Sequence, residues 1–330
     1  MKTVTDLRIR AFEPDDYERL AAIHHANFPE VKLSPNEMRR EDENFDTSKY
    51  VLKQYSAVRS GRMIGWSQYW HSPLLFHPLK FMIDIVVDPA DQQSGVGSAL
   101  YEHVMGELRN RQAILARCRV KEDMAASISF LKNRGFVEID RSWESHLAVG
   151  EFSSENYREY VRRVLSSGVT ITTLSEEARR DPSGYQKLYQ LWIREAGQDV
   201  PWPDTYTPES FEDFMKHLIN SPNMLHDGCF IAKVGDRYVG LSVSAKRETE
   251  PENLYQWFTG TIREYRGRGI AMALKLSIIE FAKLNGYEVI KTWNDSTNVG
   301  MLAINQKLGY RPHAGWITYE KRLTPASASN

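Results

Sequence analysis

The chain has 330 residues, of which 42% are hydrophobic and 26% are charged, and its formal net charge is -1. This length suits two domains of ordinary size, and the composition is that of a globular chain with a hydrophobic core. A net charge so close to zero provides no overall attraction to nucleic acid or to an anionic membrane, so neither is an expected partner. Because the chain carries no apolar leader and no long apolar run, we expect a cytoplasmic protein.

Disulfide and metal chemistry are not indicated by the sequence. The two cysteines, Cys118 and Cys229, lie far apart and show no CxxC spacing. We expect them to be unpaired thiols in a reducing compartment. The nine histidines include no HExxH motif and no mixed Cys/His cluster, so we predict no metal site.

The first half opens with a predicted strand at residues 7–11 and a helix whose apolar residues recur at spacings of three and four. A hairpin follows, with predicted strands at residues 55–58 and 63–69. The next predicted strand, residues 81–87, ends before Pro89, which cannot donate a hydrogen bond to a sheet. Strands and helices therefore alternate through this half.

A glycine-rich turn joins the strand at residues 81–87 to another predicted helix. The turn reads QQSGVG at residues 92–97, and the helix repeats Leu100, Val104 and Leu108 every four positions. Glycine lets the backbone approach a ligand closely, and the free N–H groups at the start of a helix attract anions. The turn is therefore a candidate cradle for a pyrophosphate.

The rest of the first half predicts a strand at residues 114–120, a helix that ends at Gly135, and a last strand. Residues 153–167 predict a connecting helix, because a serine begins the segment and Ser166-Ser167-Gly168 ends it. The predicted organisation is a first domain at 1–150, a connecting segment at 151–168, a second domain at 169–324 and a disordered tail at 325–330.

The second half repeats the landmarks of the first at a constant offset. RGRGIA at residues 266–271 corresponds to QQSGVG at 92–97, and LGY at 308–310 corresponds to RGF at 134–136. In both pairs the offset is 174 residues. Landmarks in the same order at the same offset indicate an old duplication.

Glycine turns of this kind also occur with other ligands or with none. A single turn of this kind is a weak signal, because a strand can pass into a helix through glycine without any ligand. A dinucleotide-binding fold needs a third glycine, which neither half supplies. The RGRG run could contact RNA, but no second basic stretch or aromatic platform accompanies it.

The strand, the Gln/Arg-x-x-Gly-x-Gly/Ala turn and the helix resemble the acyl-CoA-binding signature of the GNAT superfamily of N-acetyltransferases. Residues 92–97 and 266–271 both fit this signature, and residues 292–312 resemble the second motif of the family. The resemblance covers residues 7–148 and 169–324, and the tandem layout is similar to that of mycothiol synthase. It implies an α/β (α+β) fold of two tandem domains, each with a central mixed, mostly antiparallel sheet flanked by helices.

The resemblance also implies a cofactor, acetyl-CoA or another acyl-CoA, lying where two parallel strands part. Its pantetheine arm would pair with strand backbone, and its pyrophosphate would rest on the amides of the glycine turn. The implied cofactor-binding residues are Val87, Gln92, Gly95, Val96, Gly97 and Ser98 in the first half, and Thr259, Gly260, Thr261, Arg266, Gly267, Arg268, Gly269, Ile270, Ala271, Met272, Asn294 and Asn298 in the second.

The catalytic positions depart from the family pattern. Many members carry a tyrosine, as general acid, four residues before the terminal Gly-Phe, and that position holds Leu131 in one half and Asn305 in the other. A carboxylate on the motif strand often acts as base; Asp84 is the candidate in the first half, whereas the second has Phe258 there and Asp295 as a substitute. As structural alternatives, Asp84 would be a strand-edge acid and Asp295 a turn residue.

The predicted function is transfer of an acyl group from acyl-CoA to the amine of a small molecule, by a monomer or homodimer. We expect the second half to be the active one, because its cofactor motifs are more complete. The alternatives are a protein or peptide N-acetyltransferase and a non-catalytic acyl-CoA-binding or scaffold protein, which the missing tyrosine favours. Tyr69 and Trp202 are candidates for the acceptor pocket, unless they pack into the protein.

Overall fold

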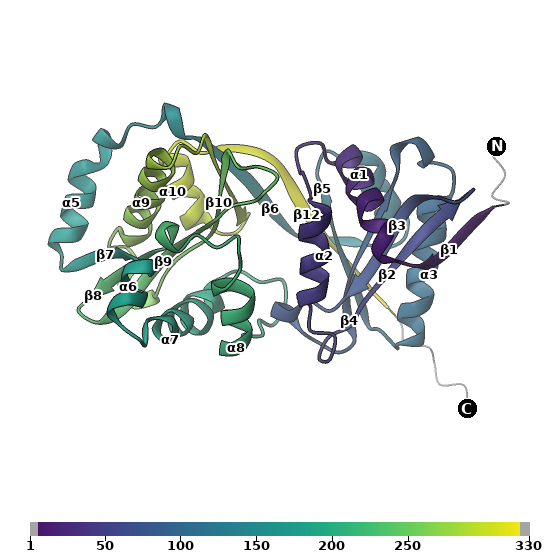
Figure 1. Cartoon of the computed structure of the whole chain (residues 1–330), viewed down its shortest axis with the longest axis horizontal. Helices are drawn as coiled ribbons and strands as arrows, with labels where there is room; N and C mark the ends of the chain where they lie inside the picture. Colours follow the sequence, from purple (N-terminus) through teal and green to yellow (C-terminus); the bar gives the residue numbers. More distant parts are fainter. Residues whose placement is uncertain (1–5, 324–330) are drawn as a thin grey trace. The chain divides into compact units, whose positions relative to one another are not determined.

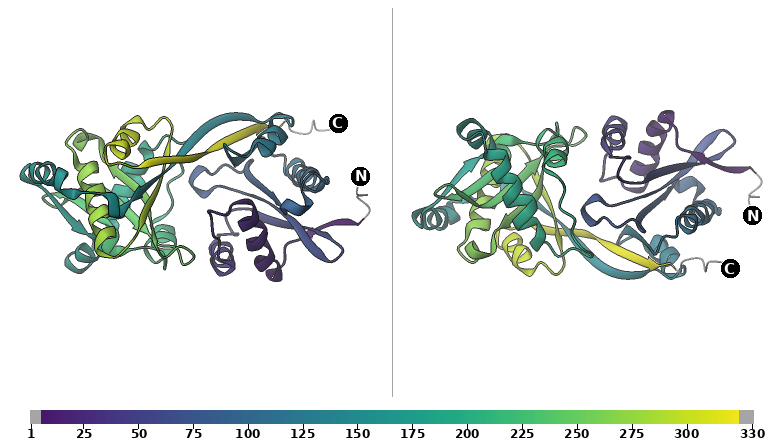
Figure 2. Two further views of the ribbon diagram at one scale, coloured as in Figure 1. Left: turned by 90° about the horizontal axis from the view of Figure 1, so that it is seen from above. Right: turned by 90° about the horizontal axis from the view of Figure 1, so that it is seen from below.

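The computed structural model describes residues 6–323, so the tail predicted at 325–330 lies outside the described residues. Figure 1 shows the chain as a ribbon, and Figure 2 gives two further views. The described residues divide into a first unit, residues 6–139 with 317–323, and a second unit, residues 140–316. Each unit has a hydrophobic core of its own.

These units correct the predicted domain boundaries. The prediction placed contiguous domains at 1–150 and 169–324, whereas the first unit is completed by residues from the far end of the chain. The cause lies in two long strands, β6 (Val137–Ala148) and β12 (Arg311–Arg322), each of which begins in one unit and ends in the other. No sequence pattern marks the point where either strand changes unit.

The first unit is built on a sheet of five strands from the first half and the end of β12. The five are β1 (Leu7–Ala11), β2 (Leu52–Arg59), β3 (Arg62–Trp70), β4 (Lys80–Val87) and β5 (Leu115–Lys121). The order is β1-β2-β3-β4-β5-β12; β1 to β4 are antiparallel neighbours, whereas β4 and β5 run parallel. Their parallel pairing ends at Met82 and Arg117, and beyond these residues the two strands part.

The end of β12 is held in the first unit by both polar and apolar contacts. The N–H of Leu323 donates to the carbonyl of Ile114 at 2.9 Å. Arg117 forms an ion pair with Glu320 at 2.7 Å, and both side chains are largely buried. Ile317 and Tyr319 belong to the core of this unit. Residues 317–322 are therefore an integral part of the first unit.

Helices cover both faces of this sheet. They are α1 (Tyr17–Asn27), α2 (Pro35–Asn44), α3 (Val96–Asn110) and α4 (Ala125–Lys132). The predicted helix after the glycine turn is α3, and its Leu100, Val104 and Leu108 are fully buried, as their spacing predicts. On the opposite face, Leu20 and Ile23 of α1 pack against strand residues, in the same cluster as Val86 of β4.

The second unit repeats this plan. Its sheet contains β7 (Val169–Thr173), β8 (Phe230–Val234), β9 (Arg237–Ala245), β10 (Asn253–Thr261), β11 (Val289–Asp295) and residues 140–148 of β6, in the order β6-β11-β10-β9-β8-β7. Only β10 and β11 are parallel among these pairs, and their pairing ends at Gln256 and Thr292. The predicted mixed, mostly antiparallel sheets flanked by helices are thus confirmed for both units.

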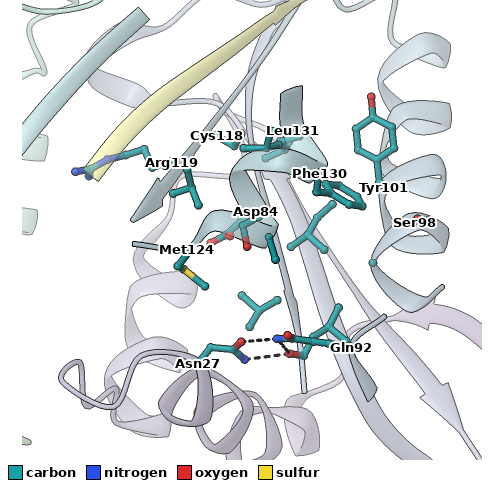
Figure 3. Close-up of a pocket in the computed structure, with 18 of the residues that line it drawn as sticks. Asn27, Asp84, Gln92, Ser98, Tyr101, Cys118, Arg119, Met124, Phe130 and Leu131 are labelled. Carbon is teal, nitrogen blue, oxygen red and sulfur yellow. Dashed lines mark hydrogen bonds between the residues drawn. The ribbon is translucent and has the colours of Figure 1, made fainter. Parts of the chain in front are cut away.

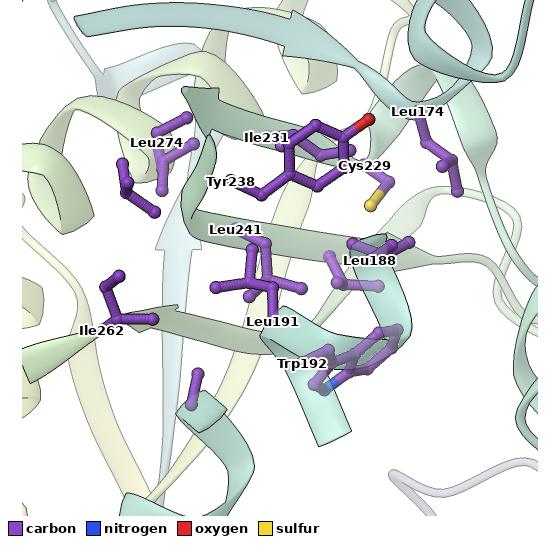
Figure 4. Packing of buried hydrophobic residues seen from close by; sticks show 14 of the residues in the cluster. Leu174, Leu188, Leu191, Trp192, Cys229, Ile231, Tyr238, Leu241, Ile262 and Leu274 are labelled. Atoms are coloured by element: carbon purple, nitrogen blue, oxygen red, sulfur yellow. The ribbon is translucent and has the colours of Figure 1, made fainter. Parts of the chain in front are cut away.

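The helices of the second unit are α5 (Arg158–Ser166), α6 (Leu174–Arg180), α7 (Gly184–Tyr189), α8 (Phe211–Phe214), α9 (Ile270–Leu284) and α10 (Val299–Lys307). A π-helical segment, residues 190–195, continues α7. Its Leu191 and Trp192 pack with strand residues such as Ile231 and Leu241, as Figure 4 shows. None of the helices in residues 6–323 has both the length and the apolar character needed to cross a membrane.

The predicted connecting helix is present as α5, and it is part of the second unit. Val164 is buried in the core of that unit. The hydroxyl of Tyr160 donates to the carbonyl of Gly269 at 3.2 Å, and the hydroxyl of Tyr157 donates to the carbonyl of Lys307 at 2.7 Å. The helix therefore packs beside the second glycine turn instead of acting as a free linker.

Candidate functional site

A cavity of about 550 Å³ lies in the first unit, where β4 and β5 part. We call it the first groove. Figure 3 shows Asp84 near the middle of the labelled lining residues, with Asn27 and Gln92 towards one end and Cys118 and Leu131 towards the other. The groove thus extends from the glycine turn along the parted strands.

The glycine turn of the first groove has the geometry of an anion site. Gly95 precedes α3 with φ 88°, and a Cβ built there would meet no atom within 4 Å. The first intrahelical hydrogen bond joins the N–H of Ala99 to the carbonyl of Gly95. The N–H groups of Val96, Gly97 and Ser98 therefore have no acceptor within the helix, and such groups bind phosphate readily.

Of the residues predicted to bind the cofactor in this half, Val87, Gln92, Gly95, Gly97 and Ser98 line the first groove. The side chain of Val96 does not, because it is buried in the core between α3 and the sheet. An additional cation lies next to the turn: Nη2 of Arg134 donates to Oγ of Ser98 at 2.9 Å. Arg134 carries no motif signal, so sequence reasoning missed it.

Asp84 lies on β4 and reaches the first groove. Burial raises the pKa of its carboxyl from the ordinary 3.8 to about 6, and the N–H of Ile85 partly offsets this effect by hydrogen bonding. In the described part of the chain, no Lys, Arg or His forms an ion pair with Asp84. The side chain of Cys118 is near enough for the two groups to interact electrostatically, and burial raises its own pKa to about 12.

The second unit has a corresponding cavity of about 570 Å³, which we call the second groove. Most of the cofactor residues predicted for this half line it: Thr259, Gly260, Thr261, Arg266, Gly267, Gly269, Ile270, Ala271, Met272 and Asn298. Arg268 and Asn294 are not among the lining residues. Nη2 of Arg268 donates to the carbonyl of Glu264 at 3.1 Å, and Oδ1 of Asn294 accepts a hydrogen bond from Asn305.

Arg266, the first residue of the second glycine turn, is paired with a carboxylate. Nη2 of Arg266 contacts Oδ2 of Asp199 at 2.5 Å, and Nε of Arg263 donates to Oδ1 of the same carboxylate at 2.8 Å. The hydrogen bonds from Arg263, together with both positive charges, lower the pKa of Asp199. This turn is also more crowded than the first, since a Cβ at Gly269 would clash with the hydroxyl of Tyr160.

The catalytic candidates of the second half lie apart from this groove. Asp295 accepts a hydrogen bond from the N–H of Thr297 at 2.6 Å, as turn residues do, and it is not among the lining residues. Asn305 is 2% exposed, and its Nδ2 donates to Asn294 at 2.6 Å. Phe258 lines the groove where the first half has Asp84, and its ring packs against Trp192.

Of the acceptor candidates, Tyr69 is fully buried in the core, and Trp202 stacks on Tyr206 with ring centroids 5.4 Å apart. Both cysteines are buried and free, as expected. The described residues contain no group of three or more His, Cys, Asp or Glu side chains arranged to hold a metal ion.

Comparison with known proteins agrees with this geometry. The model of the acetyltransferase (GNAT) family matches residues 17–136 and 185–310. An uncharacterized N-acetyltransferase of Methanocaldococcus jannaschii is 28% identical over 106 residues, which represent 29% of this chain and 46% of that protein. The chain thus spans about half the length of this curated relative.

Two solved structures share the fold over nearly the whole chain. A GCN5-related N-acetyltransferase from Sphaerobacter thermophilus has a TM-score of 0.70 at 15% identity, covering 97% of this chain and 96% of that one. A tandem GNAT protein from the clavulanic acid biosynthesis pathway has a TM-score of 0.72 at 17% identity, covering 98% and 100%. Because the family model matches both halves and more than half of the chain, the protein belongs to the GNAT family of acetyltransferases, with one copy of the family's domain in each half.

Proposed function

We propose that the protein transfers an acyl group from acyl-CoA, with acetyl-CoA the expected donor, to the amine of a small molecule, and that the first groove is the active one. The observation that carries the proposal is Asp84, a carboxylate without a cationic partner inside a groove built on the family's cofactor turn. A groove of about 550 Å³ is in the range that holds small ligands.

The residues of the first groove have separable roles. The amides of Val96, Gly97 and Ser98, with Arg134 beside them, would hold the pyrophosphate. With a pKa of about 6, Asp84 is ionised at neutral pH and accepts a proton from the neutral amine as its nitrogen attacks the acyl carbon. When bound, the thioester supplies the acyl group and a thiolate leaving group.

The bonding changes balance without a further reactant. The nitrogen of the amine forms a bond to the acyl carbon, and the carbon–sulfur bond breaks. Leu131 lines the groove at the position where many family members carry an acidic tyrosine, so the thiolate takes its proton from solvent. Asp84 returns its proton to solvent before the next turnover.

Assigning activity to the first groove reverses the expectation drawn from the motifs. In the second groove, Phe258 occupies the position that corresponds to Asp84. A phenyl ring can accept no proton, and Asp295 is engaged in a turn. The second groove would therefore bind acyl-CoA without activating an amine.

Two matched substitutions test this assignment. Gly95 and Gly267 both have positive φ, 88° and 74°, and in both cases a Cβ would meet no atom within 4 Å. Gly95→Glu and Gly267→Glu therefore impose similar backbone strain and place a carboxylate at their respective turns. Gly269 is the counterpart of Gly95 at the offset of 174 residues, but a Cβ at Gly269 would clash with Tyr160, so Gly267 is the test position.

The measurements are calorimetric titration with acetyl-CoA and release of free thiol in the presence of a panel of small amines. We expect Gly95→Glu to abolish thiol release, and Gly267→Glu to remove only a binding site. Loss of turnover in Gly267→Glu alone would mean that the second groove, and not the first, is the active one. Tight binding of acetyl-CoA without thiol release for any amine would favour the non-catalytic alternative.

A further inference from the structure

We propose that Asn27 and Asp199 are positioning residues that hold the phosphate-binding turns in place. Each bonds the first side chain of the turn in its own unit, Gln92 or Arg266, and we call these two pairs the turn latches. The inference rests on the proposed function in so far as the turns bind the phosphates of acyl-CoA. The geometry of the latches themselves is independent of any ligand.

The latch of the first unit is a closed set of hydrogen bonds, drawn as dashed lines in Figure 3. Nε2 of Gln92 donates to Oδ1 of Asn27 at 2.8 Å and to the carbonyl of Val87 at 3.2 Å. Nδ2 of Asn27 donates to the same carbonyl at 3.0 Å and to the carbonyl of Ile23 at 2.8 Å. Asn27 thus joins the end of α1, the end of β4 and the start of the turn.

The latch of the second unit joins equivalent elements with different chemistry. Nε of Arg266 donates to the carbonyl of Thr261 at 3.0 Å, and Nη2 contacts Oδ2 of Asp199. Thr261 and Arg266 follow Val87 and Gln92 by the duplication offset of 174 residues. The two amides of the first latch correspond to a cation and an anion in the second. In both units the first side chain of the turn bonds the carbonyl at the end of the strand and a side chain from the preceding helical segment, whereas the contact from Asn27 to that carbonyl belongs to the first unit.

The first turn needs this support, because one of its residues is strained. Gln93 has φ 56°, a left-handed conformation that is unfavourable for a residue with a side chain. The corresponding residue of the second unit is Gly267, with φ 74°, which bears no such cost. Strained residues persist only where their surroundings hold them. The latch of the first unit therefore holds Gln93, and with it the amides that follow.

The latch also fixes the turn relative to the base. Asn27 is the last residue of α1, and α1 packs in one cluster with Val86 of β4. Val86 lies two residues after Asp84, so both side chains are on the same face of the strand. A latched turn keeps a bound phosphate at a constant distance from Asp84. Disrupting the latch should therefore weaken acyl-CoA binding first, and leave the affinity for the amine unchanged.

The test uses the full-length chain with the second groove blocked by Gly267→Glu. In this background we compare Asn27→Leu, Gln92→Leu and the double variant Asn27→Asp with Gln92→Arg, which transplants the charged latch. We expect each leucine variant to raise the Kd for acetyl-CoA at least tenfold, with KM for the amine within a factor of two. The transplanted pair should bring the Kd back to within threefold of the parent.

Hydrogen–deuterium exchange of residues 92–98, measured without ligand, provides a second readout. We expect faster exchange in both leucine variants and a return to the parent rate in the charged pair. Unchanged Kd and unchanged exchange in Asn27→Leu would overturn the inference, as would failure of the charged pair to rescue either one. If the parent bound no acetyl-CoA, the proposed function would fail, and the exchange data would still decide whether the latch orders the turn.

Discussion

Replacing Asp84 by asparagine should stabilise the protein while it removes the proposed base. The pKa of this carboxyl rises from 3.8 to about 6 on folding. Each tenfold change in proton affinity is worth about 1.4 kcal/mol, so keeping the carboxylate ionised costs the folded state about 3 kcal/mol. The amide of an asparagine carries no charge, so this cost would disappear in the variant.

The sign and the pH window follow from the direction of the shift. Because the folded-state pKa of Asp84 lies above the unfolded value, the contribution to stability is complete below pH 3.8 and is lost as the pH rises through about 6. The asparagine variant should therefore exceed the parent in stability at pH 8 and match it near pH 4. For a unit of this size, 3 kcal/mol corresponds to about 6–12 °C in the unfolding midpoint.

The assay is thermal unfolding of the parent and of Asp84→Asn between pH 4 and pH 8, together with thiol release at pH 8. Asp15→Asn serves as the matched control, because Asp15 is exposed and lies in the same unit. Parallel stability curves for Asp84→Asn and the parent over this range would refute the reasoning. In the parent, kcat/KM should fall about tenfold per pH unit below pH 6.

Three further results are expected. Arg117→Leu leaves Glu320 buried without its partner and should cost about 3–5 kcal/mol in urea unfolding, whereas a double leucine variant should recover most of it. Cys118 and Cys229 are buried with pKa values raised to about 12, so neither should react with iodoacetamide at pH 8 until the chain is unfolded. Leu131→Tyr introduces the general acid found in many family members, which would protonate the leaving thiolate, and should raise thiol release several-fold. An unchanged rate would contradict the proposal that the reaction takes place beside Leu131 in the first groove.

The sequence predicted the elements that local patterns control. The helix that follows each glycine turn could be recognised because its apolar residues repeat every four positions and the residue before it needs a positive φ. Gly95 and Gly269 both adopt that conformation, with φ 88° and 84°. The parted parallel strands were implied by the resemblance to the GNAT family, and both units have them.

The contacts of the turn latches could not be predicted in the same way. Gln92 bonds Asn27 over 65 residues, and Arg266 bonds Asp199 over 67. Contacts at such separations leave no periodic signal in the sequence. Arg266 carried a positive charge in the motif, but nothing local indicated that Asp199 would neutralise it. The preference for the second half rested on its more complete cofactor motifs, which do not show such long-range contacts.

The predicted domain boundary was wrong for a related reason. The sequence predicted a last strand in each half, and β6 and β12 lie there, but strand propensity does not specify which sheet a strand joins. Residues 317–323 join the first unit through the contacts of Leu323 with Ile114 and of Glu320 with Arg117, about 200 residues earlier in the chain. A break near residue 150 was the simplest division of a duplicated sequence, and it assumes that each half supplies its own last strand.

The exchange of last strands affects how the protein is made. The first unit has all but one of its strands once Ile139 has been synthesised, yet the strand that completes it ends at Arg322. At about 5–20 residues per second, the ribosome needs on the order of 10–40 s to travel between these positions. Throughout that time β5 would present an unpaired edge, the kind of surface on which chains aggregate. The unit translated first is therefore completed last, and a nascent chain that stalls within the second half would leave the proposed active site in an unfinished sheet.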